Sequence, residues 1–205
     1  MKTLRQITSV ILFAAAFQGL MAVPLGYDIG TGSTVTANTT DPGLIIGTSL
    51  SAGLPAVAFT LNDGQSSTFA FFNIWTDESS VNAGEDTVPK TISAYLDFAI
   101  PSPNSGTTTT GETYGVRSGL LGFYQNGQLT WDGPVMVTAA DRTFEISLSD
   151  EVFNAGEFWG LGCKGATVEA TVTQRSSSVP DSSATLSLLG FGMLAIAGCR
   201  RLFNC

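Results

Sequence analysis

The chemistry open to this chain is limited first by a residue type that it lacks. None of its 205 residues is histidine. Ser-His-Asp and Cys-His catalytic centres use an imidazole as general base, and the usual zinc and copper sites use imidazole nitrogens as ligands. The sequence therefore excludes these classes of active site.

Carboxyl groups remain as candidate catalytic groups, because a glycosidase uses two Asp or Glu side chains, one as acid and one as nucleophile or base. The candidates for such a pair are Asp97, Glu112, Asp132, Glu145 and Glu169. No local motif selects two of them, and solvated carboxylates on strand faces are the simpler interpretation. We therefore expect no catalytic residues and no enzymatic activity, with a glycan-processing enzyme as an alternative.

Calcium is the ion that the acidic residues suit best. Two acidic pairs, Asp77-Glu78 and Glu85-Asp86, lie on either side of Ser79 to Gly84. Hard oxygen ligands on a flexible loop favour Ca²⁺, although this spacing differs from that of an EF-hand loop. The alternative interpretation is that these acidic residues only make the loop soluble. We expect no other metal ion and no organic cofactor.

Aromatic side chains offer a second kind of binding site. The candidates for a platform on which sugar rings stack are Trp75, Trp131 and Trp159, together with Tyr95, Tyr114 and Tyr124. Core packing explains aromatic residues in strands more simply. A carbohydrate-binding module associated with extracellular polysaccharide therefore stays an alternative function.

Short strands are the elements that would position these side chains. Apolar and alternating segments predict strands at Ala56 to Leu61, Ser67 to Thr76, Ile92 to Ile100, Leu120 to Gln125, Gln128 to Trp131, Thr143 to Ser149 and Ala166 to Thr173. No helical period interrupts them. We predict an all-β fold with a single antiparallel β-sandwich of jelly-roll-like topology, and a barrel is the other arrangement that fits.

The same patterns predict which faces are buried. Ser67 to Thr76 carries apolar residues on both faces, which indicates a central strand. Ile92 to Ile100 alternates more cleanly, with Asp97 on the mostly wet face. Thr143 to Ser149 and Ala166 to Thr173 each place one apolar face inward.

Turn residues predict two hairpins and a loop. Asn62 to Ser66 is expected to join two strands as a hairpin, and Asn126-Gly127 is expected to form a type I′ turn because both residues tolerate positive φ. Pro101 to Gly106 should stop a strand, and Thr107 to Thr110 should extend that loop. Ser176 to Ser178 is expected to be a short spacer after the domain.

The predicted domain, Val23 to Ser178, is strongly acidic. It holds 16 acidic and 5 basic residues, a net charge of −11. Such a surface repels the phosphates of nucleic acids and anionic lipid headgroups, so we expect no nucleic-acid partner. Cys163 is the one cysteine of this region, so no disulfide can form within it. A half-buried residue near a turn is the expected role of Cys163, and pairing with a second chain is the alternative.

The N-terminal residues predict export. Lys2 and Arg5 form a basic segment, Ile7 to Phe17 an apolar one, and Gln18 to Ala22 a short polar end. This order is that of a secretory signal peptide, and we expect residues 1–22 to be removed by cleavage after Ala22.

The C-terminal residues predict a second targeting segment. Val179, Pro180, Asp181, Ser182 and Ser183 precede an uncharged apolar run, Ala184 to Cys199, which is followed by Arg200 and Arg201. The 16 residues of the run are fewer than the roughly 20 that a membrane-spanning helix needs, so we expect a short transmembrane helix that spans only marginally. The two arginines are the expected membrane stop and favour the cytoplasmic side, which leaves the domain outside.

This tail resembles the PEP-CTERM class of bacterial sorting signals, in particular the variant that usually reads Val-Pro-Asp-Ser-Gly. It departs from that variant at Ser183 and in the additional residues Leu202 to Cys205. The resemblance is limited to residues 179–205. It implies recognition by an exosortase, a membrane-embedded transpeptidase-like enzyme, in Gram-negative bacteria that make extracellular polysaccharide. In that case Val179 to Ser183 are substrate residues of the exosortase.

The leading hypothesis is therefore a non-enzymatic exported protein of the cell surface or extracellular matrix. Its expected segments are a signal peptide (1–22), a β-sandwich domain (23–178) and a sorting tail (179–205). We expect the tail to anchor the protein in the membrane, transiently or permanently. The expected partners are an exosortase and, in the alternative, extracellular polysaccharide.

Overall fold

The computed structural model describes residues 24–101, 105–118, 124–139, 141–154 and 165–177. These residues belong to one compact unit, Pro24–Ser177. The predicted signal peptide and the predicted sorting tail lie outside the described residues, as do Trp159 and Cys163. Within the described ranges, no helix is long and apolar enough to cross a membrane.

Two five-stranded antiparallel sheets form the two layers of the domain. The β13 sheet has the strand order β10 (Val135–Ala139), β11 (Arg142–Leu148), β13 (Ala166–Ser177), β5 (Ser66–Trp75) and β3 (Gly47–Leu50). The β8 sheet has the order β12 (Glu151–Phe153), β9 (Tyr124–Trp131), β8 (Thr107–Ser118), β6 (Lys90–Leu96) and β2 (Thr34–Thr36). The predicted antiparallel β-sandwich is confirmed.

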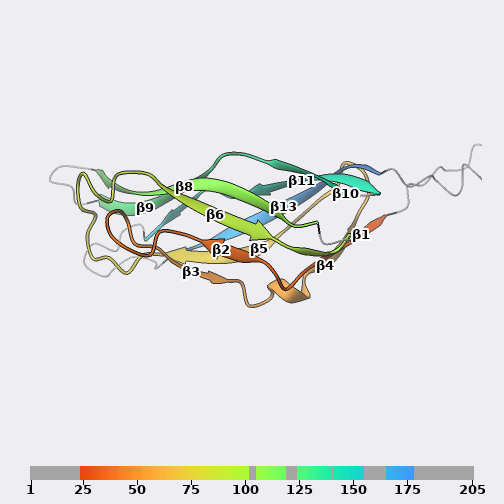
Figure 1. Cartoon of the computed structure of the whole chain (residues 1–205), viewed down its shortest axis with the longest axis horizontal. Coiled ribbons are helices and arrows are strands. Elements are labelled where there is room, and N and C mark those ends of the chain that lie inside the picture. Colours follow the sequence, from red (N-terminus) through yellow and green to blue (C-terminus); the bar gives the residue numbers. More distant parts are fainter. Residues whose placement is uncertain (1–23, 102–104, 119–123, 140, 155–164, 178–205) are drawn as a thin grey trace, which may run out of the picture. The chain divides into compact units, whose positions relative to one another are not determined.

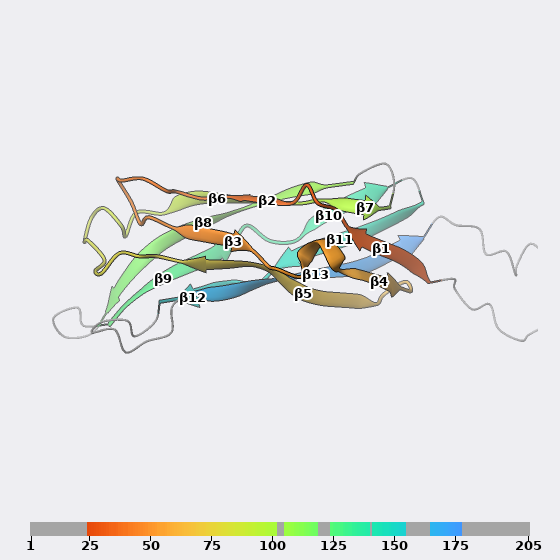
Figure 2. The ribbon, with the colours of Figure 1, turned by 90° about the horizontal axis from the view of Figure 1, so that it is seen from below.

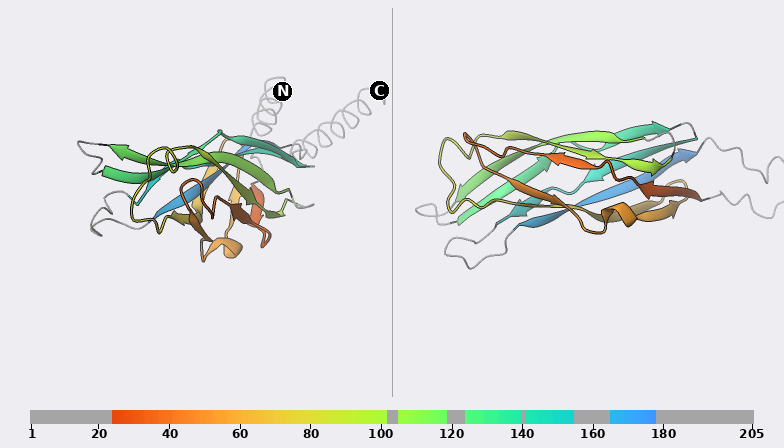
Figure 3. Two further views of the ribbon diagram at one scale, coloured as in Figure 1. Left: turned by 60° about the vertical axis from the view of Figure 1, so that its left-hand side comes forward. Right: turned by 60° about the horizontal axis from the view of Figure 1, so that its bottom comes forward.

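A smaller sheet lies at one end of these layers. This β1 sheet has the order β4 (Ala58–Leu61), β1 (Leu25–Ile29) and β7 (Phe98–Ile100), and a turn of 3₁₀ helix, η2 (Leu54–Ala56), precedes β4. Figures 1 and 2 show it at the end of the domain where β1 begins and β13 stops. Figure 3 shows the red and blue strands meeting there in a further view. We call this the terminal end and the opposite one the loop end.

The core fills the space between the layers, as the alternating patterns predicted. The fully buried side chains of the β13 sheet include Phe144, Ile146, Val168, Ala170 and Val172, and those of the β8 sheet include Ile92, Ala94 and Leu96. Burying one large aliphatic or aromatic side chain of this kind contributes about 1.5–3 kcal/mol. The single apolar faces predicted for β11 and β13 are therefore confirmed, and they hold the two sheets together.

β5 is a central strand, as predicted, but its apolar residues are arranged differently from the prediction. The register with β13 shifts at Phe71, which has no partner and forms a β-bulge. The bulge lets Phe71 and Phe72, neighbours in sequence, both be buried completely. Beyond it, Asn73 and Trp75 lie on the outer face of the sheet. The inward-facing residues of β5 are therefore odd-numbered up to Phe71 and even-numbered from Phe72 onward.

The hairpin predicted at Asn62 to Ser66 is right about the turn and wrong about the pairing. The N–H of Gln65 donates to the carbonyl of Asn62 (3.0 Å), and Gly64 has a φ of 80°. However, β4 pairs with β1, whereas β5 pairs with β13 and β3. The turn therefore passes the chain from one sheet to another. Within the β1 sheet, Phe59 of β4 stacks on its ladder partner Tyr27 of β1 (5.2 Å between ring centroids).

The type I′ turn predicted at Asn126-Gly127 is wrong. Both residues lie within β9, opposite Val116 and Gly115 of β8. Phe153 of β12 packs directly over Gly127, and a Cβ there would collide with its ring. Glycine serves here for close approach within a strand, which is the other common reason for a glycine in such a place. The connection between β8 and β9 falls at 119–123, outside the described residues.

Two segments predicted as loop and spacer are paired strand. Thr107 to Thr110 begin β8 and pair with Ser93 to Leu96 of β6, which suits β-branched residues. Ser176 and Ser177 end β13 and pair with β11, where Ser177 is opposite Arg142. The spacer prediction is wrong for these two serines, so the chain is held in the sheet up to residue 177.

The predicted strand Ile92 to Ile100 is two strands, because the chain changes sheet at Asp97. β6 belongs to the β8 sheet and β7 to the β1 sheet. Asp97 is buried at this corner and not on a wet face. Its Oδ2 accepts from the N–H of Gly32 (3.0 Å), its carbonyl accepts from the N–H of Gly30 (2.9 Å), and its own N–H donates to Oγ of Ser33 (3.0 Å). Asp97 therefore fastens the segment that joins β1 to β2.

Candidate functional site

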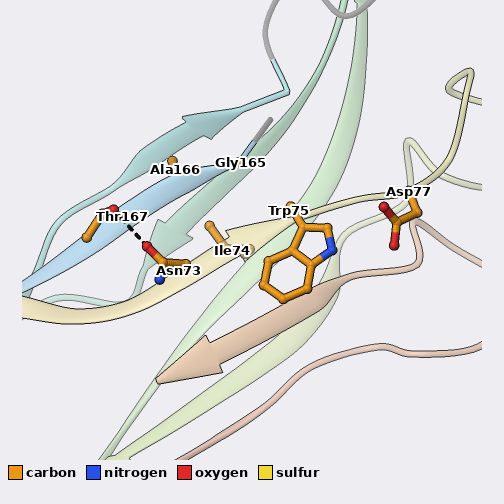
Figure 4. A pocket seen from close by; sticks show the side chains of 7 residues that line it. All are labelled: Asn73, Ile74, Trp75, Asp77, Gly165, Ala166 and Thr167. Atoms are coloured by element: carbon orange, nitrogen blue, oxygen red, sulfur yellow. Dashed lines mark hydrogen bonds between the residues drawn. The ribbon is translucent and has the colours of Figure 1, made fainter. Parts of the chain in front are cut away.

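A hollow of about 390 Å³ lies beside Trp75, where β5 ends and β13 begins. Figure 4 shows the indole of Trp75 together with the side chains of Asn73, Asp77 and Thr167. Thr167 donates from its hydroxyl to Oδ1 of Asn73 (2.8 Å). The hollow thus combines an aromatic ring with amide, hydroxyl and carboxyl groups.

The position of Trp75 depends on a glycine in the neighbouring strand. Gly47 of β3 is directly opposite Trp75 in the ladder. A Cβ at Gly47 would collide with the indole, so the ring lies over the bare backbone. This contact keeps Trp75 half-buried and holds the wall of the hollow in place.

The two described tryptophans do not share a surface. Trp131 of β9 packs against the core, with its ring edge-to-face to Phe72 at 6.3 Å between centroids. Its indole N–H donates to the carbonyl of Ser149 (3.1 Å). Trp131 is therefore used in packing, while Trp75 lies on the outer face of the other layer and Trp159 lies outside the described residues.

The three candidate tyrosines lie on the outer face of the β8 sheet. Tyr124 is the most open, with 69 % of its surface exposed. Tyr114 donates its hydroxyl to Oε1 of Gln128 (2.7 Å), and the ring of Tyr95 lies over Gly106. They come from β6, β8 and β9, so the structure places them on one sheet, opposite to the layer that carries Trp75.

The five candidate catalytic carboxylates are distributed over three parts of the fold. Asp97 is at the corner described above. Glu112 lies in β8, and Asp132 directly follows β9. Asp132 accepts a hydrogen bond from the hydroxyl of Thr110. Glu145 and Glu169 lie on the outer face of the β13 sheet.

The two carboxylates of the β13 sheet are separated along the strands. Glu145 is opposite Thr173, four residues from Glu169 on β13, which corresponds to about 13 Å along a strand. Glu145 is also bound to the guanidinium of Arg175 (2.7 Å). The spacing used by glycosidases is roughly 5–9.5 Å.

The acidic loop that joins β5 to β6 brings together two of the four calcium candidates. Asp86 lies close enough to Glu78 for its charge to act on the Glu78 carboxyl group. Asp77 is exposed and lines the hollow beside Trp75, and Glu85 is half-buried. Within the described residues, no group of three or more Cys, Asp or Glu side chains is arranged to hold a metal ion. Glu78 and Asp86 therefore form a pair.

Burial and a like charge act together on this pair. Burial raises the pKa of Glu78, and the negative charge of Asp86 raises it further. The N–H of Ile45 donates to Oε1 of Glu78 (2.5 Å), which opposes these effects. Asp86 is 0 % exposed.

A polar cluster at the terminal end was not predicted from the sequence. Arg142 is 7 % exposed and donates to the carbonyl of Gly26 (2.5 Å) and to both carboxylate oxygens of Asp141 (2.6 and 2.9 Å). Its guanidinium lies 5.1 Å from the ring centroid of Tyr27. The hydroxyl of Tyr27 donates to Oε1 of Gln174. We call these side chains the Arg142 cluster.

Within the Arg142 cluster, the charge of Arg142 is balanced by that of Asp141. The hydrogen bond from Arg142 lowers the pKa of Asp141, and burial raises the pKa of the Tyr27 hydroxyl. One sequence signal could have revealed the Arg142 cluster. Gln174 follows Val168, Ala170 and Val172 at every second position of β13, so it too faces inward. A polar residue at an inward position indicates a buried hydrogen-bond network.

Comparison with known proteins identifies the segment that follows β13. Residues 178–203 match the family described as VPDSG-CTERM motif. A search of curated proteins and of solved structures found no match to the chain. The match confirms the resemblance of the C-terminal tail to a PEP-CTERM-type sorting motif. Such a motif implies an exported protein that is associated with the envelope and processed by an exosortase-like system.

Proposed function

We propose that this is a non-enzymatic protein of the cell surface or extracellular matrix, whose β-sandwich is delivered by an exosortase-type system. The observation that supports the proposal most is the position of the sorting motif. The motif match begins at residue 178, directly after Ser177, the last paired residue of β13. In sequence, the sorting motif therefore follows the last strand of the domain directly.

The arrangement of the chain ends fits display on a surface. Leu25 at the start of β1 and Ser177 at the end of β13 both lie at the terminal end (Figure 1), and Arg142 connects them because it pairs with Ser177 and binds Gly26. The first and the last described strands of the domain are therefore fastened to each other at the end from which the sorting motif continues in sequence.

Localisation of a tagged protein in its own host would test this proposal. Deleting 179–205 should abolish delivery to the cell surface and release the domain or leave it in the periplasm. A matched variant in which Val179, Pro180 and Asp181 are replaced by alanine, with the apolar segment intact, should stay in the membrane without being processed. Surface delivery that is unchanged in both variants would contradict the role of the tail.

Carbohydrate binding is the second candidate, and the hollow beside Trp75 is the observation that favours it. Sugar sites commonly combine an apolar ring face with a few polar groups. Retention of the full-length protein on the extracellular polysaccharide of the host should fall at least tenfold in Trp75→Ala. Tyr124→Ala, an exposed aromatic on the opposite sheet, is the matched control and should bind normally. Equal binding by Trp75→Ala, Tyr124→Ala and the unaltered protein would remove this candidate.

A further inference from the structure

The loop between β5 and β6 is fastened firmly at the loop end of the domain. Val81 is 6 % exposed and lies against Gly115 of β8, where a Cβ would collide with it. The N–H of Val81 donates to Oε1 of Gln125 (2.5 Å), and the N–H of Gly115 donates to the carbonyl of Asp86 (2.7 Å). The backbone around Asp86 is thus attached to β8 and β9 before any ligand is considered.

This attachment buries a carboxylate that is only partly satisfied. Oδ2 of Asp86 accepts from the N–H of Asn82 (2.6 Å). Oδ1 of the same group has no hydrogen-bond partner, although Asp86 is 0 % exposed. A buried charged oxygen without a partner is costly, and native proteins rarely leave one. Oδ1 of Asp86 therefore needs a hydrogen-bond donor or a cation that the described side chains do not supply.

The neighbours of Asp86 in the structure make the requirement stronger. The carboxyl group of Glu78 lies beside Asp86, and the charged groups that act on Glu78 are the carboxylates of Asp86 and Asp41. Two like charges at close range repel each other unless a counter-charge lies between them. No Lys or Arg of the described residues forms an ion pair with either of them. A cation at Oδ1 of Asp86 would supply this counter-charge.

We propose that Glu78 and Asp86 bind a divalent cation, Ca²⁺, which fastens the acidic loop to the β8 sheet. Both ligands are hard oxygen donors, which suit Ca²⁺, and Oδ1 of Asp86 has no other partner. Water completes the shell of 6–8 oxygens that Ca²⁺ takes. A site with two carboxylates belongs to the weak class, with a dissociation constant of about 10⁻⁴–10⁻³ M, as in extracellular modules.

The site differs from the four-residue set that the sequence suggested. Asp77 lines the hollow beside Trp75, and the charges that act on Glu78 are those of Asp86 and Asp41, not that of Glu85. These two acidic residues provide matched controls, because they carry the same charge and lie in the same loop. The inference does not depend on the sorting motif or on carbohydrate binding.

Calorimetric titration of the purified full-length protein with CaCl₂ at pH 7.5 tests the site directly. We expect one bound ion per protein. With free Ca²⁺ at ten times the dissociation constant, the Tm should be about 3–6 °C higher than in chelator. Glu78→Gln and Asp86→Asn should lose the heat signal and the Tm shift. Asp77→Asn and Glu85→Gln should keep both.

Three results would overturn the proposal. The first is the absence of a Ca²⁺ signal in the unaltered protein. The second is a Tm that rises on acidification from pH 7.5 to 5 but does not change when Ca²⁺ is added. A proton, and not a cation, would then lie between the two carboxyl groups. The third is loss of the signal in Asp77→Asn with retention in Glu78→Gln. If Asp86→Asn does not fold, the half-buried Glu78 decides the question alone.

Discussion

At the terminal end of the sandwich, Arg142 is buried among groups that accept its hydrogen bonds. At the loop end, the half-buried Glu78 lies near the fully buried Asp86. The first cluster contains its own counter-charges, and every strong interaction in it lies within the chain. The second holds two like charges and an unpartnered oxygen. The charges of the terminal end are therefore balanced within the chain, whereas at the loop end we propose that Ca²⁺ supplies the balance.

The largest effect that tests this difference is expected at the terminal end. Arg142→Ala should reduce the free energy of unfolding by about 2–3 kcal/mol, because it leaves the Gly26 carbonyl unpaired and removes the cation above Tyr27. Urea denaturation of the full-length protein measures the loss. Arg175→Ala breaks an exposed ion pair with Glu145 and should cost less than about 1 kcal/mol. Equal losses of unfolding free energy in Arg142→Ala and Arg175→Ala would contradict a structural role for the Arg142 cluster.

A smaller effect should follow from removing one hydroxyl of the same cluster. Tyr27→Phe keeps the stacked ring but leaves Oε1 of the fully buried Gln174 without its donor. We expect a loss of about 1–2 kcal/mol by the same denaturation assay. Tyr114→Phe removes a hydroxyl bound to Gln128 on the outer face, where water can replace it, and serves as the control. A loss in the control as large as in Tyr27→Phe would contradict the distinction.

The loop end should respond to neutralisation with the opposite sign. In chelator at pH 7.5, Glu78→Gln removes the repulsion from Asp86 and should raise the free energy of unfolding by up to about 1 kcal/mol. In saturating Ca²⁺ the same substitution should be destabilising, because the ion loses a ligand. A substitution that destabilises equally in both conditions would indicate an ordinary hydrogen-bonding role for Glu78.

The smallest expected effect is a pH dependence confined to the loop end. The pKa of Glu78 is raised by folding from its ordinary value of 4.5. Its contribution to stability in chelator is therefore fully present below about pH 4.5 and is lost as the pH rises through the folded pKa. The unaltered protein should lose more stability than Glu78→Gln between pH 4.5 and 7 in thermal denaturation. Parallel curves for the two proteins would refute this assignment.

Sequence patterns predicted the elements with one uninterrupted apolar face. Thr143 to Ser149 and Ala166 to Thr173 alternate cleanly, and both became strands with the expected side chains in the core. The buried face of β5 was predicted less well. A bulge at Phe71 changes which positions face inward, and no residue type in the segment signals a bulge. Asn126-Gly127 misled for a different reason, since the glycine makes room for Phe153 and does not turn the chain.

The candidate sites were predictable only in part. The tail was identified from residues alone, because a sorting motif is a linear signal. The acidic loop was noticed for its composition, but the contact between Glu78 and Asp86 depends on how β8 fastens the loop. Arg142 and Gln174 were missed, because the residues that satisfy them, Gly26 and Tyr27, are more than a hundred positions away in sequence.

β13 is the last described strand before the sorting motif, and its two neighbours cover different parts of it. It pairs with β5 over Ala166 to Thr173 and with β11 over Ala170 to Ser177, where the last pair is Ser177 with Arg142. A pulling force applied at Ser177 would therefore act first on the backbone hydrogen bonds to β11. The ladder to β5 would carry load only once those bonds had opened as far as Thr173. Resistance to unfolding from this end of the strand thus depends on β11, whose first residue is Arg142.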